Sequence, residues 1–224
     1  MRAGSKGPTL TVFLEGDGRP WVRGAEISFD PATRRPIALD LLARTPPPVA
    51  YIVRPCYVST RDAGCTPDLW TSARYSQAVV ASVAAAIRDA MRRASASEAR
   101  LVGYSGGGAL AVLVAERLER VGGVTTIGAN LDVDAWTKHH GYLPLERSLD
   151  PARSPRPHPW PELHLQGERD ENVPPNTTDA YFERYPDAQR RVLAGFDHAC
   201  CWVEAWPDIG QIRDQPQSTQ RSQR

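Results

Sequence analysis

The sequence of 224 residues has no long apolar segment. Its longest uninterrupted apolar run is Ala109–Ala115, whereas a membrane-spanning helix needs about 18 such residues or more. The first ten residues, MRAGSKGPTL, lack the apolar core that a signal peptide has. We therefore expect neither a membrane span nor a signal peptide in this chain.

Neither sign of charge predominates. There are 27 Lys and Arg residues against 26 Asp and Glu residues, which gives a formal net charge of +1. Proteins that bind nucleic acids or acidic membrane surfaces through bulk charge carry a clear basic excess. The balance argues against both kinds of partner, and we expect a small-molecule substrate instead.

Cysteine is scarce, and the four that occur include no C-x-x-C pair, which argues against a zinc site. Cys56 and Cys65 lie in one loop-like segment, RPCYVSTRDAGCTP, and could close a small disulfide ring. Cys200 and Cys201 are neighbours. Because adjacent cysteines rarely bond each other, we expect at least one of them to be buried as a small apolar residue.

Apolar, β-branched segments alternate with segments of helical periodicity along most of the chain. The pattern predicts strands at 9–15, 49–53, 99–104, 124–130, 162–167 and 189–195, and helices at 36–44, 72–93 and 107–120. In the second helix Tyr75, Val79, Val83, Ile87 and Met91 recur every four residues on one face. Such alternation is typical of an α/β fold, with a mostly parallel sheet of about six strands and helices on both faces.

The domain organisation is simple. Residues 1–210 are expected to form one domain, and the polar segment 211–224 a disordered tail. Residues 131–160 interrupt the alternation and are rich in proline towards their end, so we interpret them as a short excursion over the site. Ligand sites in such folds lie beyond the carboxyl ends of the strands, so the loops there are the place to seek chemistry.

The glycine-rich segment after the third strand has two interpretations. Gly106, Gly108 and Ala111 match the dinucleotide fingerprint G-x-G-x-x-G/A, and Asp132 lies where a ribose-binding acid would. These features would make the protein a nucleotide-binding oxidoreductase. However, the fingerprint normally occupies the first strand–helix turn of its unit, and here two such units come first.

The second interpretation makes Ser105 a nucleophile. The segment Gly103-Tyr104-Ser105-Gly106-Gly107 matches G-x-S-x-G, in which the serine lies on a sharp strand-to-helix turn. Asp170 follows the fifth expected strand and His198 follows the sixth. The order serine, acid, histidine along the chain is typical of α/β-hydrolases.

Both downstream residues have competitors. His198 competes with His139, His140, His158 and His164, and is favoured because it follows the last strand. Asp170 competes with Asp132 and Asp134, since some hydrolases take the acid after an earlier strand.

Over roughly residues 9–206 the chain resembles the α/β-hydrolase superfamily of serine hydrolases. It is most similar to a bacterial subgroup of small hydrolases that often carry export or lipoprotein signals. The matching stretches are FLEGDGRPW, VRPCYVSTRDAGC, LWTSARYS, GYSGGGALAVLVA, GANLDVDAWT and GERDENVP. Compared with the usual fold, the chain is expected to begin at what would be the third strand, so we expect the first two strands of that fold to be lacking.

The resemblance implies a nucleophile at Ser105, a general base and acid at His198, and an orienting acid at Asp170. It also implies an oxyanion hole formed by the N–H of Gly106 and one N–H from the loop after the first strand. In that loop the N–H of Asp17 is the best candidate for the second donor. Because Glu15 stands where these hydrolases usually have a histidine, the N–H groups of Gly16 and Gly18 stay open as alternatives. No metal or organic cofactor is implied.

The expected activity is hydrolysis of small carboxylic esters. A peptidase or thioesterase with the same triad, or a catalytically idle binding protein, are alternatives. Trp21, Trp136 and Trp202 could line an acyl pocket or simply pack in the core. The short excursion predicts a shallow pocket that prefers acyl chains of roughly two to six carbons, without activation at a lipid interface. The resemblance and the Cys56/Cys65 pair favour a periplasmic or secreted protein, whereas the lack of a signal peptide keeps a cytoplasmic location open as the alternative.

Overall fold

The computed structural model describes residues 7–24, 26–154 and 159–210. The expected tail, 211–224, lies outside the described residues. The strands are β1 (Thr9–Leu14), β2 (Trp21–Val22), β3 (Glu26–Ile27), β4 (Val49–Ile52), β5 (Glu98–Tyr104), β6 (Val121–Ile127), β7 (Glu162–Gly167) and β8 (Gln189–Leu193). The α-helices are α1 (Ile37–Ala43), α2 (Gln77–Ala94), α3 (Gly106–Ala115), α4 (Val133–His140), α5 (Asp179–Arg184) and α6 (Trp202–Ala205).

Six strands form one sheet in the order β4-β1-β5-β6-β7-β8, and every neighbouring pair in it is parallel. The predicted parallel sheet of about six strands is therefore confirmed. The short strands β2 and β3 pair antiparallel in a separate hairpin. Because all six strands run the same way, their carboxyl ends meet at one edge, and the loops that follow them gather there.

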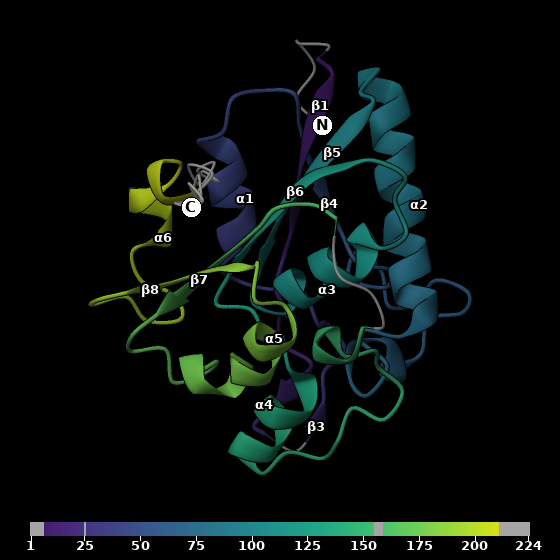
Figure 1. Cartoon of the computed structure of the whole chain (residues 1–224). Helices are drawn as coiled ribbons and strands as arrows, with labels where there is room; N and C mark the ends of the chain where they lie inside the picture. The colour runs from purple at the N-terminus through teal and green to yellow at the C-terminus, as the bar shows by residue number, and fades with distance from the viewer. Residues whose placement is uncertain (1–6, 25, 155–158, 211–224) are drawn as a thin grey trace, which may run out of the picture.

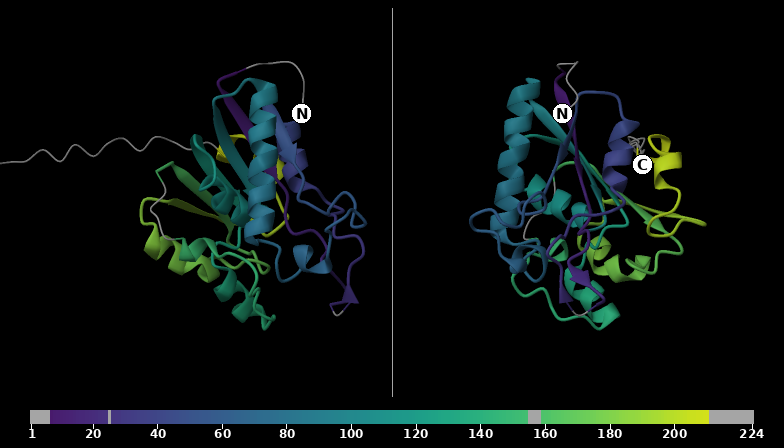
Figure 2. Two further views of the ribbon diagram at one scale, coloured as in Figure 1. Left: turned by 90° about the vertical axis from the view of Figure 1, so that its right-hand side faces the viewer. Right: turned by 180° about the vertical axis from the view of Figure 1, so that it is seen from behind.

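Helices cover both faces of the sheet, as Figures 1 and 2 show. On one face α1 and α6 pack over a cluster that includes Phe13, Leu41 and Trp202. On the other face α2 and α3 pack over a larger cluster. All ten residues of α3 are buried, which agrees with its uniformly apolar sequence. This central helix carries the turn that contains Ser105 at its amino end.

Two helices differ from the sequence-based expectation. α2 begins at Gln77, five residues later than predicted, because the Oγ of Ser76 accepts the Val79 N–H and caps the helix there. Tyr75 therefore lies outside α2, although it fits the apolar periodicity. α3 ends at Ala115, where exposed residues from Glu116 onward turn back towards β6.

The excursion at 131–160 contains a helix that its composition did not predict. Asp132 caps α4 by accepting the Ala135 N–H at 2.8 Å, and Gly141 ends it with φ at +66°. Residues 155–158 of this excursion lie outside the described residues. None of the helices in the described ranges is both long enough and apolar enough to cross a membrane.

All four cysteines are paired. Cys56 and Cys65 are joined by a disulfide, with a Cα–Cα distance of 5.6 Å. Cys200 and Cys201 are also joined, so the expectation of an unpaired, buried cysteine at this place is wrong. The chain turns sharply there, with the φ of Cys201 at +85°, and both residues are only half-buried.

Candidate active site

Ser105 occupies a sharp turn between β5 and α3. Its φ is +51° and its ψ is −129°, a conformation that non-glycine residues rarely adopt. The close approach of strand and helix explains the glycines on either side. A Cβ on Gly103 would lie 2.3 Å from the Gly107 carbonyl oxygen, and one on Gly107 would lie 2.3 Å from the carbonyl oxygen of Leu14. The G-x-S-x-G spacing is thus a steric requirement of this turn.

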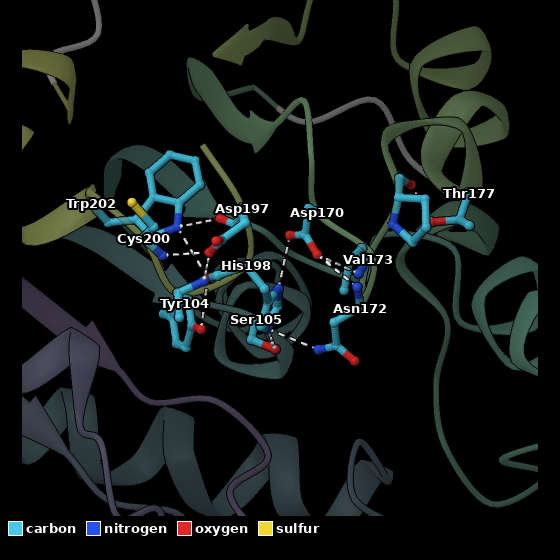
Figure 3. Close-up of polar contacts among 12 residues, drawn as sticks. Tyr104, Ser105, Asp170, Asn172, Val173, Thr177, Asp197, His198, Cys200 and Trp202 are labelled. Atoms are coloured by element: carbon cyan, nitrogen blue, oxygen red, sulfur yellow. Dashed lines mark hydrogen bonds and ion pairs between the residues drawn. The ribbon is translucent and has the colours of Figure 1, made fainter. Parts of the chain in front are cut away.

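His198 lies between Ser105 and Asp170, as Figure 3 shows. Its Nε2 is 3.0 Å from the Oγ of Ser105, and its Nδ1 is 2.8 Å from the Oδ2 of Asp170. The three side chains come from loops after β5, β7 and β8, whose carboxyl ends share one edge of the sheet. They form an unbroken hydrogen-bonded chain that could pass a proton from the hydroxyl to the imidazole.

Asp170 is buried and fixed by its own loop. Its Oδ1 accepts the N–H of Asn172 at 2.9 Å and the N–H of Val173 at 2.7 Å. These two bonds hold one carboxylate oxygen, which leaves the Oδ2 directed at His198. A buried carboxylate with all of these partners is well suited to orienting an imidazole.

The main chain around His198 is held in three places. The hydroxyl of Tyr104 donates to the His198 carbonyl at 2.9 Å, and the indole N–H of Trp202 donates to it at 3.1 Å. The carboxylate of Asp197 accepts the N–H groups of Cys200 and Ala199, and these bonds hold the pKa of Asp197 below its ordinary value. The loop that carries the imidazole is therefore well ordered by its own contacts.

Asn172 is a site residue that the sequence did not reveal. Its Nδ2 lies 2.9 Å from the same His198 Nε2 that faces Ser105. The main-chain carbonyl oxygen of Asn172 lies 2.7 Å from the indole nitrogen of Trp136 and 2.8 Å from the Nε2 of His140, both on α4. The only signal in the sequence is its place two residues after Asp170, so these contacts could be found only from the fold.

The competing aspartates lie elsewhere. Asp132 caps α4, and Asp134 forms an exposed ion pair with Arg153. His164 is fully buried, with Nδ1 2.8 Å from the Thr126 hydroxyl.

Two further candidate histidines belong to α4. His139 and His140 lie at the end of α4 and contact each other edge to face. His158 lies outside the described residues.

The dinucleotide interpretation is not supported by the packing. A Cβ on Gly108 would lie 2.4 Å from the Cβ of Ala129, so this glycine allows α3 to approach the loop after β6. Asp132 is engaged as a helix cap rather than directed at a ligand. Among the described residues, no group of three or more His, Cys, Asp or Glu side chains is arranged to hold a metal ion.

A cavity of about 1010 Å³ opens over Ser105 and His198. Trp21 and Trp136 line it, as do Tyr142 and Leu143 from the segment after α4. The cavity is larger than the short excursion suggested, because α4 and the segment after it, which the proline-rich sequence did not predict, contribute to its lining. The shallow shape expected from the sequence stays a prediction.

Trp202 does not line the cavity, which corrects its assignment as a pocket residue. Trp202 is fully buried and packs against Phe196. Its indole N–H donates to the His198 carbonyl and so helps to hold the loop that carries the imidazole.

The loop after β1 lies beside Ser105. A Cβ on Gly16 would lie 3.2 Å from the Cβ of Ser105. The carboxylate of Glu15 accepts the Gly16 N–H at 3.2 Å and the Ala38 N–H at 3.1 Å, and burial raises its pKa. Within the described residues, the N–H groups of Asp17 and Gly106 donate to no protein acceptor. Gly16 is therefore a poorer candidate donor for an oxyanion than Asp17.

Comparison with solved structures shows the fold. MGS-MChE2, an α/β hydrolase enzyme from a metagenome of sediments of the Mar Chica lagoon in Morocco, is 15% identical over 87% of this chain and 84% of its own, with a TM-score of 0.52. The mouse α/β hydrolase domain-containing protein 10 is 17% identical over 87% and 83%, with a TM-score of 0.53. A puromycin-hydrolyzing peptidase from Mycobacterium tuberculosis is 16% identical over 88% of this chain but only 32% of its own, with a TM-score of 0.56.

None of the curated proteins compared with the chain matches it. The sequence profile of one family, described as serine hydrolase (FSH1), matches residues 68–199. This match spans more than half of the chain, and it includes Ser105, Asp170 and His198. The fold is that of the α/β-hydrolases, and the chain belongs to the serine hydrolase (FSH1) family.

Proposed function

We propose that the protein hydrolyses small-molecule carboxylic esters through an acyl-enzyme formed on Ser105. The observation that carries the proposal is the hydrogen-bonded chain from Ser105 through His198 to Asp170, with heavy-atom distances of 3.0 and 2.8 Å. The distance from Ser105 to His198 is within the range over which a general base takes a proton directly. The distance from His198 to Asp170 is that of a hydrogen bond that orients the imidazole.

In the first half-reaction the Oγ of Ser105 attacks the ester carbonyl while the Nε2 of His198 takes the hydroxyl proton. The adjacent carboxylate of Asp170 stabilises the imidazolium that forms. Collapse of the tetrahedral intermediate breaks the ester C–O bond, and the imidazolium gives its proton to the departing alcohol. A water molecule then attacks the acyl-enzyme, with His198 again as base, and the carboxylic acid leaves.

The tetrahedral intermediate places a negative charge on the former carbonyl oxygen. We assign its stabilisation to the N–H groups of Gly106 and Asp17. Gly106 is the first residue of α3, so its N–H lies at the positive end of the helix dipole. Asp17 lies in the loop that packs against Ser105, and its N–H has no acceptor among the described residues.

The cavity indicates the substrate. Its aromatic and aliphatic lining from Trp21, Trp136 and Leu143 suits an apolar acyl or alcohol group, and its volume of about 1010 Å³ accommodates more than a short acyl chain. We therefore assign a small-molecule ester with an apolar part.

The test is hydrolysis of p-nitrophenyl acetate by the wild type and by Ser105→Ala. Loss of a nucleophile should lower kcat by about 10⁶. Because the serine lies on a turn and adds little packing, the variant should keep the wild-type circular dichroism spectrum. Turnover by the folded variant at the wild-type rate would refute the proposal.

A further inference from the structure

Three separate segments of the chain meet at the loop that follows β1, which is one of the three. The segment LEGDG supplies Asp17, VRPC supplies Arg54, and ARYS supplies Arg74 and Tyr75. These four residues, called here the Asp17 cluster, take no part in the hydrogen-bonded chain of Ser105. Tyr75 is fully buried, and the side chains of Arg54 and Arg74 are only 4% and 6% exposed. Burial of this many polar groups beside a reaction centre needs a reason.

The carboxylate of Asp17 is held from three sides. Its Oδ1 is 2.7 Å from the Nη2 of Arg54, and its Oδ2 is 3.0 Å from the Nη1 of Arg74. The hydroxyl of Tyr75 donates to the same Oδ2 at 2.5 Å. Asn130 in turn donates to the Tyr75 oxygen at 3.0 Å, so the tyrosine is fixed as well.

The main chain of Asp17 is held too. The hydroxyl of Tyr57 donates to the Asp17 carbonyl at 3.0 Å. The guanidinium of Arg54 lies 5.5 Å from the ring centroids of both Tyr57 and Tyr75, within the range of a cation–π contact. With its carboxylate and carbonyl fixed, Asp17 can rotate little about its backbone bonds, and the direction of its N–H is fixed with them.

The Asp17 cluster lies directly against Gly106. A Cβ on Gly106 would lie 1.9 Å from the Asp17 Oδ1 and 2.5 Å from the Tyr75 hydroxyl. Only glycine fits at this place, so the residue after the nucleophile is in van der Waals contact with the cluster. The two proposed oxyanion donors thus belong to residues that touch.

The Asp17 cluster carries one net positive charge. Burial alone would raise the pKa of Asp17, but Arg54 and Arg74 outweigh it and hold this pKa below its ordinary value. The carboxylate is therefore ionised, and both guanidinium groups stay charged beside it. One negative and two positive charges leave a single positive charge next to the place where the oxyanion develops.

We propose that Arg54, Arg74 and Tyr75 are positioning residues that hold the Asp17 N–H towards the oxyanion and keep one positive charge beside it. This inference rests on the proposed function. It explains why an acidic residue stands at an oxyanion-hole position: its charge is neutralised, and its side chain serves as the anchor.

The experiment compares Tyr75→Phe with a matched control, Tyr181→Phe. Tyr181, in α5, is also fully buried, and its hydroxyl donates to the carboxylate of Glu162 at 2.6 Å. Both variants should lower the thermal midpoint. Only Tyr75→Phe should lower kcat, by about 10- to 100-fold, with KM changed by less than about threefold, since one oxyanion donor is worth about 10²–10³ in kcat.

A second readout separates this role from a structural one. An alkyl boronic acid binds the serine oxygen as a tetrahedral anion and so imitates the charged intermediate. Tyr75→Phe should raise the inhibition constant of the boronic acid by the same factor by which it lowers kcat. Tyr181→Phe should leave this inhibition constant unchanged. Equal effects of the two variants on kcat, or a loss of kcat in Tyr75→Phe without a loss of boronate affinity, would overturn the inference.

The charge is tested by Arg74→Met and Arg74→Lys. Arg74→Met removes the net positive charge and should lower kcat and boronate affinity by at least as much as Tyr75→Phe. Arg74→Lys keeps the charge, so its kcat and its boronate affinity should each be at least about tenfold higher than those of Arg74→Met. No recovery would refute the electrostatic part.

A wild type without Ser105-dependent turnover would refute the proposed function and this inference together. An active wild type with unaffected Asp17 cluster variants would refute the inference alone.

Discussion

Ser105 and His198 are 93 positions apart in the sequence, yet the serine Oγ lies 3.0 Å from the histidine Nε2. The parallel sheet brings the two loops together, because β5 and β8 end at the same edge. Asp170, from the loop after β7, completes the chain at 2.8 Å from the imidazole Nδ1. Each of the predictions below changes one part of this arrangement or of its surroundings.

Asp170→Asn should lower kcat by about 10⁴, because an amide in place of the carboxylate favours the wrong tautomer of His198. Asp132→Asn and Asp134→Asn are the matched controls, since neither side chain contacts the imidazole and both should change kcat by less than about threefold. Steady-state hydrolysis of p-nitrophenyl acetate measures all three. A severe loss in either control with a mild one in Asp170→Asn would move the acid to the loop after β6.

Asp17→Asn should lower the free energy of unfolding by about 3–5 kcal/mol at neutral pH, because it leaves two buried arginines without their carboxylate. The pKa of Asp17 lies below 3.8, the ordinary value, so the folded state binds fewer protons than the unfolded state. The stabilisation by Asp17 is therefore full above about pH 4 and is lost as the pH falls through the lowered pKa.

Urea titrations of wild type and Asp17→Asn between pH 3 and pH 7 measure this dependence. The difference between the two proteins should be constant above about pH 4 and shrink below it. A difference that grows as the pH falls would mean that Asp17 is not ionised in the folded protein.

The disulfide between Cys56 and Cys65 closes a ring of about ten residues and should stabilise the oxidised protein by about 2–3 kcal/mol on the chain-entropy model. The double variant Cys56→Ser/Cys65→Ser should show that loss in urea unfolding without reductant. With reductant present, wild type and variant should become similarly stable. A peptide map of the oxidised protein with both thiols alkylated would contradict the pairing.

Acyl-chain preference should extend beyond the six carbons expected from the sequence. Each buried methylene is worth about 0.8 kcal/mol, so kcat/KM should rise from acetate through octanoate by up to about fourfold per methylene. Leu143→Ser, which removes an apolar side chain from the cavity wall, should reduce this dependence on chain length. A maximum at butyrate or shorter in a p-nitrophenyl ester series would show that the cavity does not take the acyl chain.

Much of the fold follows from local pattern. The strands are short apolar runs between turn residues, and β7 has the bounds that its sequence predicts. The placement of Ser105, Asp170 and His198 near one another follows from the same pattern, because parallel strands bring the loops at their carboxyl ends together. The local sequence therefore predicts where the strands end, and with this which loops lie at the same edge of the sheet.

The rest depends on contacts between distant segments. Tyr75 has the spacing of a helix-face residue, but α2 begins only after the cap at Ser76, so Tyr75 lies outside it. The Tyr75 hydroxyl instead binds Asp17, 58 positions away. The main-chain carbonyl of Asn172 accepts the indole N–H of Trp136, which lies in α4, a helix that the proline-rich composition of the excursion did not predict. Trp202 reads equally well as a pocket or a core residue, and only its bond to the His198 carbonyl decides between them.

The central claim is that Ser105 is the nucleophile, and labelling with a fluorophosphonate tests it most directly. Intact-mass analysis of the wild type should show one adduct, and peptide mapping should place it on Ser105. Ser105→Ala should take up no label under the same conditions, and Asp170→Asn should react much more slowly. No adduct on the folded wild type, or an adduct on another residue that persists in Ser105→Ala, would contradict the account.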